Sequence, residues 1–194
     1  MSIRIANESD LSQILEIYRP YAENTTVSFE YDAPTLESFR ARFRGITKQF
    51  PWLVWEEAGV ILGYAYACAP FERAAYQWCA EPSIYLLPQA QGKGIGRKLY
   101  DALEKLLTLQ GYRTLYAIVT TDNTPSIAFH KAVGYRHLAD FPNCGFKLDR
   151  WHGITWLEKP LFSVDFPTDS PRPISKIVKL DQNLQDFLDK ITLT

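Results

Sequence analysis

The sequence predicts a mixed α/β fold, and three observations carry that prediction. Strand-like and helical segments alternate along the chain instead of being grouped by type. The segment 52–68 has the pattern of a β-hairpin, which gives the sheet antiparallel pairing. The segment 84–110 has the pattern of a strand, a glycine-rich turn and a helix. We therefore expect a mixed sheet flanked by helices.

The first 50 residues predict one strand and two helices. Ile3–Ala6 is the strand, and Asn7 is placed to cap the helix that follows it. Apolar residues then recur at helical spacing at Leu11, Ile14, Leu15 and Tyr18. Pro20 is expected to kink or end this helix, because proline lacks a backbone N–H group. Pro34-Thr35 opens a second helix, whose apolar stripe is Leu36, Phe39, Phe43 and Ile46.

The middle of the chain predicts three strands and the glycine-rich turn. Trp52–Glu57 and Val60–Cys68 form a hairpin around Ala58-Gly59. Gln77–Leu86 is the next strand. After it, glycines stand at the alternate positions Gly92, Gly94 and Gly96. A helix then runs to Gln110-Gly111 on the apolar stripe Ile95, Leu99, Leu103 and Leu106.

The next segment predicts three more strands and a short helix. Leu115–Thr120 is a strand, and a helix over about residues 124–133 follows it and is ended by Gly134. Tyr135–Leu138 and Trp151–Glu158 are the closing strands.

Residues 1–161 are expected to form one domain, and residues 162–194 a C-terminal arm with a short amphipathic helix. The arm has no clear period and contains Pro167, Pro171 and Pro173. Apolar residues then recur at helical spacing at Leu180, Leu184, Phe187, Leu188 and Ile191. Because so short a helix is marginal alone, it must dock either on its own domain or on a second copy of the chain.

Composition excludes several classes of protein. The net charge of the 194 residues is −1, so we expect no broad attraction to nucleic acid or to an anionic membrane surface. No apolar run is long enough to span a bilayer, and the N-terminus lacks the pattern of a signal peptide. Cys68, Cys79 and Cys144 lack metal-ligand spacing. We expect buried, reduced thiols in a cytoplasmic protein, and no metal.

The glycine-rich turn is the main functional signal. It exposes backbone N–H groups at a helix N-terminus, where the helix dipole favours anions. Glycine also lets a phosphate approach the backbone more closely than a side chain would allow. A P-loop and a dinucleotide fingerprint would both need glycine at positions that hold Arg97 or Leu99. We therefore expect a phosphorylated ligand bound by a different kind of loop.

The spacing Gln91-x-x-Gly94-x-Gly96 resembles the acetyl-CoA pyrophosphate loop of the GNAT N-acetyltransferase superfamily, and the order of elements matches that fold. Seven further motifs occur in order: Thr26–Phe29, Pro51–Val54, Arg73-x-x-Tyr76, Glu81, His130–Tyr135, Gly145–Lys147 and Trp151-His152. Together they resemble the phosphinothricin N-acetyltransferase family, a GNAT branch that acetylates the amino group of small amino-acid-like molecules. The resemblance covers about residues 2–160.

The resemblance implies acetyl-CoA as co-substrate. The loop residues expected to bind it are Gly92, Lys93, Gly94, Ile95, Gly96 and Arg97. The edge of the preceding strand, at Ile84, Tyr85 and Leu86, is expected to pair with the pantetheine arm like an added strand. A backbone N–H there is implied to polarise the thioester carbonyl. Asn123, otherwise a plain helix N-cap, is implied to contact the cofactor as well.

The resemblance also assigns catalytic roles. Glu81 is implied to be the general base, because an α-amine is mostly protonated at neutral pH and must lose a proton before it attacks. Taken alone, Glu81 is an exposed carboxylate at a strand end. Asn123, Ser126 and His130 share one helical face. The motif around His130 favours a role in placing the substrate or relaying a proton, and a satisfied structural histidine is the alternative.

Three residues are implied to hold the acceptor. Arg73 and Tyr76 are the anchors, because a guanidinium can hold a carboxylate or phosphinate through two parallel hydrogen bonds. Phe29 is the apolar wall. A solvated loop charge is the alternative for Arg73. Further residues expected to line or support the pocket are Lys147, Trp151 and His152.

Two positions depart from the family. Gly153 stands where the family often has Asp after Trp-His, and Phe71 stands where many relatives carry a polar or basic residue. Both bear on the acceptor pocket and leave the glycine-rich loop untouched. We expect direct N-acetyltransfer with Glu81 as base, in a homodimer, as is usual for the resembled family. The alternatives are a peptide or protein N-terminal acetyltransferase and a non-catalytic CoA-binding module.

Overall fold

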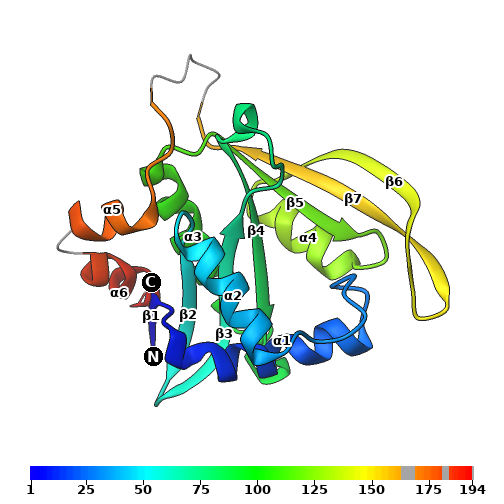
Figure 1. Ribbon diagram of the computed structural model, residues 1–194, viewed down its shortest axis with the longest axis horizontal. Coiled ribbons are helices and arrows are strands. Elements are labelled where there is room, and N and C mark those ends of the chain that lie inside the picture. Colours follow the sequence, from blue (N-terminus) through cyan, green and yellow to red (C-terminus); the bar gives the residue numbers. More distant parts are fainter. Residues whose placement is uncertain (163–168, 181–183, 194) are drawn as a thin grey trace.

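The computed structural model describes residues 1–162, 169–180 and 184–193, and it has the predicted mixed sheet flanked by helices (Figure 1). The seven strands lie in the order β1-β2-β3-β4-β5-β7-β6. Their bounds are β1 Ser2–Ile5, β2 Trp52–Glu57, β3 Val60–Cys68, β4 Cys79–Leu86, β5 Thr114–Thr120, β6 Arg136–Lys147 and β7 Arg150–Pro160. Every neighbouring pair is antiparallel except β4 and β5, which are parallel.

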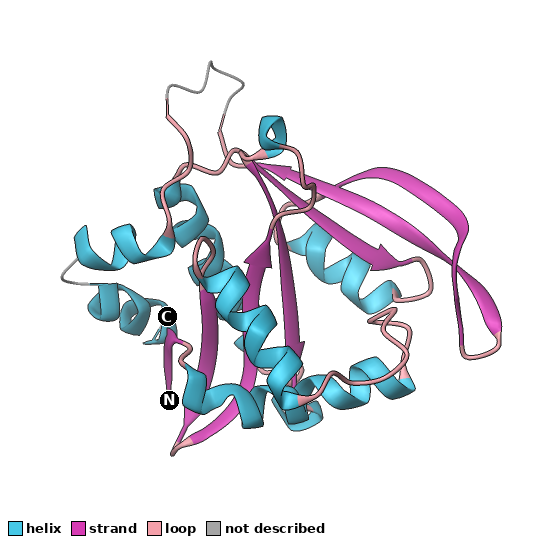
Figure 2. Cartoon of the chain, in the orientation of Figure 1, coloured by secondary structure: helices cyan, strands magenta, loops and turns pink. Residues whose placement is uncertain are grey.

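Helices cover both faces of this sheet (Figure 2). The α-helices are α1 Leu11–Asn24, α2 Leu36–Thr47, α3 Ile95–Gln110, α4 Thr124–Ala132, α5 Ile174–Leu180 and α6 Leu184–Leu193. Short 3-10 turns are η1 Glu8–Asp10, η2 Ala74–Tyr76 and η3 Pro88–Ala90. Alternation of side chains along the strands divides the core into two layers. One lies under α1 and α2, and the other lies under α3, α5 and α6.

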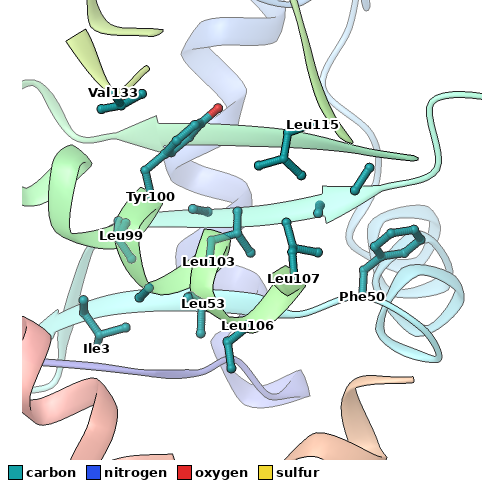
Figure 3. Packing of buried hydrophobic residues seen from close by; sticks show 14 of the residues in the cluster. Ile3, Phe50, Leu53, Leu99, Tyr100, Leu103, Leu106, Leu107, Leu115 and Val133 are labelled. Atoms are coloured by element: carbon teal, nitrogen blue, oxygen red, sulfur yellow. The ribbon is translucent and has the colours of Figure 1, made fainter. Parts of the chain in front are cut away.

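The amphipathic helix α3 is the centre of the larger layer. Its apolar stripe packs over the inner strands, and Figure 3 shows Leu99, Leu103 and Leu107 between Leu53 of β2 and Leu115 of β5. Burial of these side chains holds the N-terminus of α3, and with it the glycine-rich loop, against the end of β4.

The helix α1 runs through Pro20 to Asn24, so of the two outcomes predicted for Pro20, an end of the helix is wrong and a kink stays a prediction. Its buried residues continue past the proline to Ala22, and this packing offsets the missing hydrogen bond.

The closing strands are much longer than predicted. β6 extends to Lys147 and forms with β7 a hairpin that projects from the sheet in Figure 1. In the sequence, Pro142, Asn143 and Gly145 suggest that a strand ends there. In the structure, β6 continues across a bulge between Phe141 and Gly145. The turn is made by Leu148 and Asp149, both with positive φ, as two-residue hairpin turns require.

The C-terminal segment also differs from the prediction. Residues 163–168, including Pro167, lie outside the described residues. The segment expected to be an irregular arm contains α5, and the helical stripe is carried by α6. Ile177, Leu184 and Leu188 join the core under α3, so these helices pack on their own domain. The predicted burial of all three thiols is wrong, since Cys144 is exposed, whereas Cys68 and Cys79 are half-buried.

Candidate active site

The site begins where β4 and β5 separate. Their parallel pairing joins Cys79 to Thr114 and Ala80 to Leu115, and then stops. The next residues of β4 are Glu81 and Pro82. Proline has no N–H to donate to a neighbouring strand, and it is found in sheets where a ladder ends. The Glu-Pro pair is therefore a sequence signal for the opening, and the prediction from the sequence did not use it.

Two hollows adjoin this opening. We call the first the inner cavity: it lies between β4 and β5, measures about 60 Å³, and is lined by Glu81, Tyr100 and His130 among others. We call the second the loop cavity: it lies against the glycine-rich loop and measures about 590 Å³. Val27, Ile84, Asn123 and Ser126 line both. Because they share these residues, the two hollows are neighbours between the glycine-rich loop and Glu81, and the loop cavity has the size of a ligand site.

The glycine-rich loop has the geometry of an anion site. Gly92 and Gly94 have φ of 71° and 78°, in a backbone region that residues other than glycine rarely adopt. Gly94 is the N-cap of α3 and has no capping side chain, so the first N–H groups of the helix are open to a ligand. Gly92, Gly94, Gly96 and Arg97 line the loop cavity. Of the other predicted loop residues, Lys93 is exposed, and Ile95 points into the core.

The edge of β4 offers a row of main-chain groups to the same hollows. Main-chain groups of successive residues in a strand point to opposite neighbours. Leu87 donates to Leu62, so the odd-numbered residues of β4 bond to β3 and the even-numbered ones face the opening. The sheet pairs neither Ile84 nor Leu86 on this side, because the ladder to β5 ends at Ala80. The main-chain groups of Tyr85 bond to β3. Tyr85 still lines the inner cavity, but it offers no main-chain group to the opening.

Glu81 is the titratable group at the mouth of the opening. Its side chain is half-buried, and burial raises the pKa of its carboxyl to about 7. The carboxyl group is therefore divided between its acid and base forms near neutral pH, as a general base requires. The predicted Glu81 lies in the inner cavity, next to the open edge of β4.

His130 is buried, and both of its ring nitrogens have partners. Nδ1 lies 2.8 Å from the carbonyl of Ser126, so it carries the proton and donates. Nε2 then accepts from the hydroxyl of Tyr100, at 2.8 Å. Burial lowers the pKa of His130, which favours this neutral form. Tyr100, on α3, was missed by the sequence reasoning, because its helical position marks it only as a core residue.

Asn123 is the N-cap of α4, as predicted. Its side-chain oxygen accepts from the N–H of Ser126, at 3.3 Å. The residue lines both cavities, so it is placed to meet a ligand there.

The three residues predicted to hold the acceptor substrate are less closely grouped than the residues around Glu81. Phe29 lies against Gly145, where an added Cβ would come within 2.8 Å of the ring. Tyr76 packs on Phe71, with ring centroids 4.8 Å apart. Arg73 is exposed and lines a separate hollow with Phe71, away from the inner cavity. Their roles toward an acceptor stay predictions.

Lys147 and His152 support the segment 25–30 rather than lining a cavity. The ammonium group of Lys147 is buried and donates to the carbonyls of Ala22 and Ser28. His152 is buried and bonds Asp122 and the carbonyl of Lys147. Trp151 is 62% exposed.

Comparison with known proteins agrees with this geometry. The family model described as an acetyltransferase (GNAT) domain matches residues 3–156. The chain belongs to the GNAT acetyltransferase family. It is 30% identical over 177 residues to a phosphinothricin N-acetyltransferase of Streptomyces viridochromogenes, a match that covers 91% of this chain and 96% of that protein.

Two further GNAT relatives are informative. An L-methionine sulfoximine/L-methionine sulfone acetyltransferase of Pseudomonas aeruginosa is 34% identical, over 81% of this chain and 92% of that protein. The crystal structure of a GNAT phosphinothricin acetyltransferase from Sinorhizobium meliloti with acetyl-CoA is 35% identical, with a TM-score of 0.84. The match covers 90% of this chain and 96% of the Sinorhizobium meliloti chain. This GNAT protein is an acetyltransferase that uses acetyl-CoA as co-substrate, and the open N–H groups of its loop and strand edge fit that ligand.

Two further features were sought among the residues that the structure describes: a metal site and a membrane-spanning helix. The described residues contain no group of three His, Cys, Asp or Glu side chains that could hold a metal ion. Among their helices, none is both long and apolar enough to cross a bilayer.

Proposed function

We propose that this enzyme transfers the acetyl group of acetyl-CoA directly to the amino group of a small amino-acid-like acceptor. The acceptor is of the phosphinothricin, methionine sulfoximine or methionine sulfone type, as named for the relatives. The observation that carries the proposal is the position of Glu81, a carboxyl of raised pKa at the point where the open edge of β4 meets the inner cavity.

In this proposal Glu81 takes the proton from the acceptor amine, directly or through water. Acetyl-CoA supplies an activated thioester. The N–H groups of Ile84 and Leu86 face its path and are suited to hold its amide groups and polarise the carbonyl. The proton taken by Glu81 then passes through water to the departing thiolate, which balances the transfer, and His130 helps to place the acceptor by holding the hydroxyl of Tyr100 at the wall of the inner cavity. Asn123 and residues 92–97 hold the cofactor.

For the acceptor, we propose Arg73 and Tyr76 as anchors and Phe29 as the apolar wall. Support comes from an aromatic cluster beside β4. Phe71 stacks on Trp156 of β7 at 5.9 Å and contacts Tyr116 and Tyr76. This cluster gives the side chain of an acceptor an apolar surface. Gly153 lies elsewhere, against Thr121 and the backbone at Phe141, where an aspartate would find no room without movement.

The test is thiol release from acetyl-CoA with a panel of acceptors. The panel holds phosphinothricin, methionine sulfone, methionine sulfoximine, ordinary amino acids, polyamines and short peptides. We expect turnover with the amino-acid analogues, and we expect Glu81→Gln to lower it about 100-fold or more while CoA binding is retained. Turnover confined to peptides or polyamines would overturn the acceptor class. CoA binding without any turnover would identify a binding module instead.

We also propose that the enzyme is a homodimer that associates through the β6–β7 hairpin. β6 is an edge strand, and five large apolar side chains of the hairpin are 46–62% exposed: Leu138, Phe141, Phe146, Leu148 and Trp151. Light scattering at micromolar concentration should give twice the chain mass, and the variant F146D/W151D should give one chain mass with an unchanged circular dichroism spectrum. A wild-type monomer would overturn this proposal. The cytoplasmic location and the boundary at residue 161 stay predictions.

A further inference from the structure

Three segments of the protein meet at the hydroxyl of Tyr21. Tyr21 lies on α1, beyond Pro20, and is half-buried. Its hydroxyl donates to the carbonyl of Leu86, the last residue of β4. It accepts from the side-chain amide of Gln91, at 3.1 Å, where the glycine-rich loop begins. A hydroxyl has one proton to donate, so the acceptor on β4 takes it and the amide supplies the second bond.

The bond to Leu86 changes what the open edge of β4 presents. Only Pro82, Ile84 and Leu86 turn their main-chain groups toward the opening. The hydroxyl of Tyr100 lies 3.3 Å from the carbonyl of Pro82, and Tyr21 bonds the carbonyl of Leu86. The hydroxyl of Tyr100 gives its one proton to His130, so the carbonyl of Pro82 stays available, whereas the carbonyl of Leu86 is occupied by Tyr21. What is left for a ligand is the carbonyl of Pro82, the N–H and carbonyl of Ile84 and the N–H of Leu86, a short stretch that Tyr21 closes at one end.

The bond to Gln91 fixes the loop relative to that stretch. Tyr21 is held by its ring, which packs edge-on against Tyr85 at 5.3 Å. Gln91 is exposed and has no other hydrogen bond from its side chain within the described part of the chain. Tyr21 and Gln91 both line the loop cavity with Gly92 and Gly94. The hydroxyl therefore sets the distance between the anion-binding turn and the donors of the strand edge.

We propose that Tyr21 is a positioning residue that aligns the glycine-rich loop with the open edge of β4, so that one CoA molecule engages both. This inference rests on the acetyl-CoA site of the proposed function. It adds a residue outside every motif that pointed to that site. Tyr21 forms none of the bonds that break or form in acetyl transfer, so it acts on cofactor affinity and not on the chemical step.

The experiment measures the CoA dissociation constant by calorimetry for the wild type, Tyr21→Phe, Gln91→Leu and the double variant. We expect each single variant to bind CoA about tenfold more weakly. Because both changes break the same link, the double variant should be no weaker than the weaker single variant within about twofold. Additive losses, or an unchanged dissociation constant for Tyr21→Phe, would overturn the proposal.

A matched control is Tyr112→Phe, which removes a hydroxyl that accepts the amide of Gln49 outside the loop cavity. It should leave CoA binding unchanged, and a loss equal to that of Tyr21→Phe would overturn the proposal. Kinetics give a second readout: for Tyr21→Phe the KM for acetyl-CoA should rise about tenfold, with kcat within about twofold of the wild type. If kcat falls and KM stays, Tyr21 is not a positioning residue for CoA.

These outcomes separate the inference from the function on which it rests. A wild-type protein that binds CoA but acetylates no acceptor would sink the proposed transferase activity, while the four dissociation constants would still decide the role of Tyr21. A wild-type protein that is active, with Tyr21→Phe unchanged, would sink only the role of Tyr21.

Discussion

The hydroxyl of Tyr100 lies 2.8 Å from Nε2 of His130, although the two residues come from different helices, α3 and α4. Because Nδ1 of the same ring is bound to the carbonyl of Ser126, Tyr100 satisfies the remaining nitrogen. The pair forms one hydrogen-bonded unit at the wall of the inner cavity.

The first prediction concerns this unit. Tyr100→Phe and His130→Ala should each lower kcat by about 100-fold, because either change removes the hydrogen bond that holds this wall of the inner cavity in place beside Glu81. The double variant should be little worse than the more impaired single variant, since the two residues act together. Steady-state kinetics measure this, with circular dichroism as the check on folding. Independent losses that multiply would show that the two residues do not act as a unit.

The second prediction is a pH profile. Only the ionised carboxylate of Glu81 accepts a proton, and burial raises the pKa of that group to about 7. The value of kcat/KM should therefore rise as pH increases through about 7 and level off above it. Glu81→Gln should lose this limb along with most of its activity. A wild-type profile that is flat from pH 6 to 8 would remove Glu81 from the role of base.

The third prediction concerns stability and needs no substrate. The pKa of Glu81 in the folded protein, about 7, is above its ordinary value of 4.5, so folding favours the protonated form. The stabilisation that this gives is complete below about pH 4.5 and is lost as pH rises through about 7. The melting temperature of Glu81→Gln relative to wild type should therefore increase from pH 5 to pH 8. Glu72→Gln, a change at an exposed carboxylate, should show no such trend.

The fourth prediction concerns Lys147, whose buried ammonium group donates to the carbonyls of Ala22 and Ser28. Lys147→Met keeps the aliphatic stem but leaves both carbonyls without this donor. We expect a loss of about 2–3 kcal/mol in the free energy of unfolding, measured with urea. Lys131→Met, at an exposed position of α4, should cost less than about 0.5 kcal/mol. Equal effects of the two changes would contradict the role given to Lys147.

The sequence predicts most of the fold, because its periodic segments are long and its caps are local. The glycine-rich loop and the stripe of α3 lie where the spacing puts them. The length of β6 was underestimated, because Pro142 and Gly145 are ordinary signals of a turn. The strand continues beyond them only because it pairs with β7. α5 was missed in a proline-rich segment, because its burial under α3 depends on contacts distant in sequence.

The candidate site is predictable only where its residues form motifs. Glu81 and His130 do so, Asn123 was found as a helix N-cap, and all three line the inner cavity. Tyr21 and Tyr100 do not, because each looks like one more apolar position on a helix. Their proposed functions depend on hydroxyl groups that reach the carbonyl of Leu86 and Nε2 of His130, 65 and 30 residues away in sequence. No local pattern specifies such contacts.

Because α6 packs against β1, the two edge strands of the sheet, β1 and β6, differ in how their main-chain groups are covered. At β1, the N–H of Ile3 donates to Thr192 and its carbonyl accepts from Gln185, so side chains of α6 occupy the outward main-chain groups of that residue. At the other edge, the carbonyl of Phe146 on β6 accepts from the hydroxyl of Tyr31, at 2.8 Å. Strand addition at β1 is therefore blocked at Ile3, whereas the 12-residue strand β6 offers a longer edge, on which Tyr31 occupies the carbonyl of Phe146. In the proposed homodimer joined at β6, both outward edges are β1 edges on which α6 is docked, so such an assembly would close at two and would not extend into a fibre.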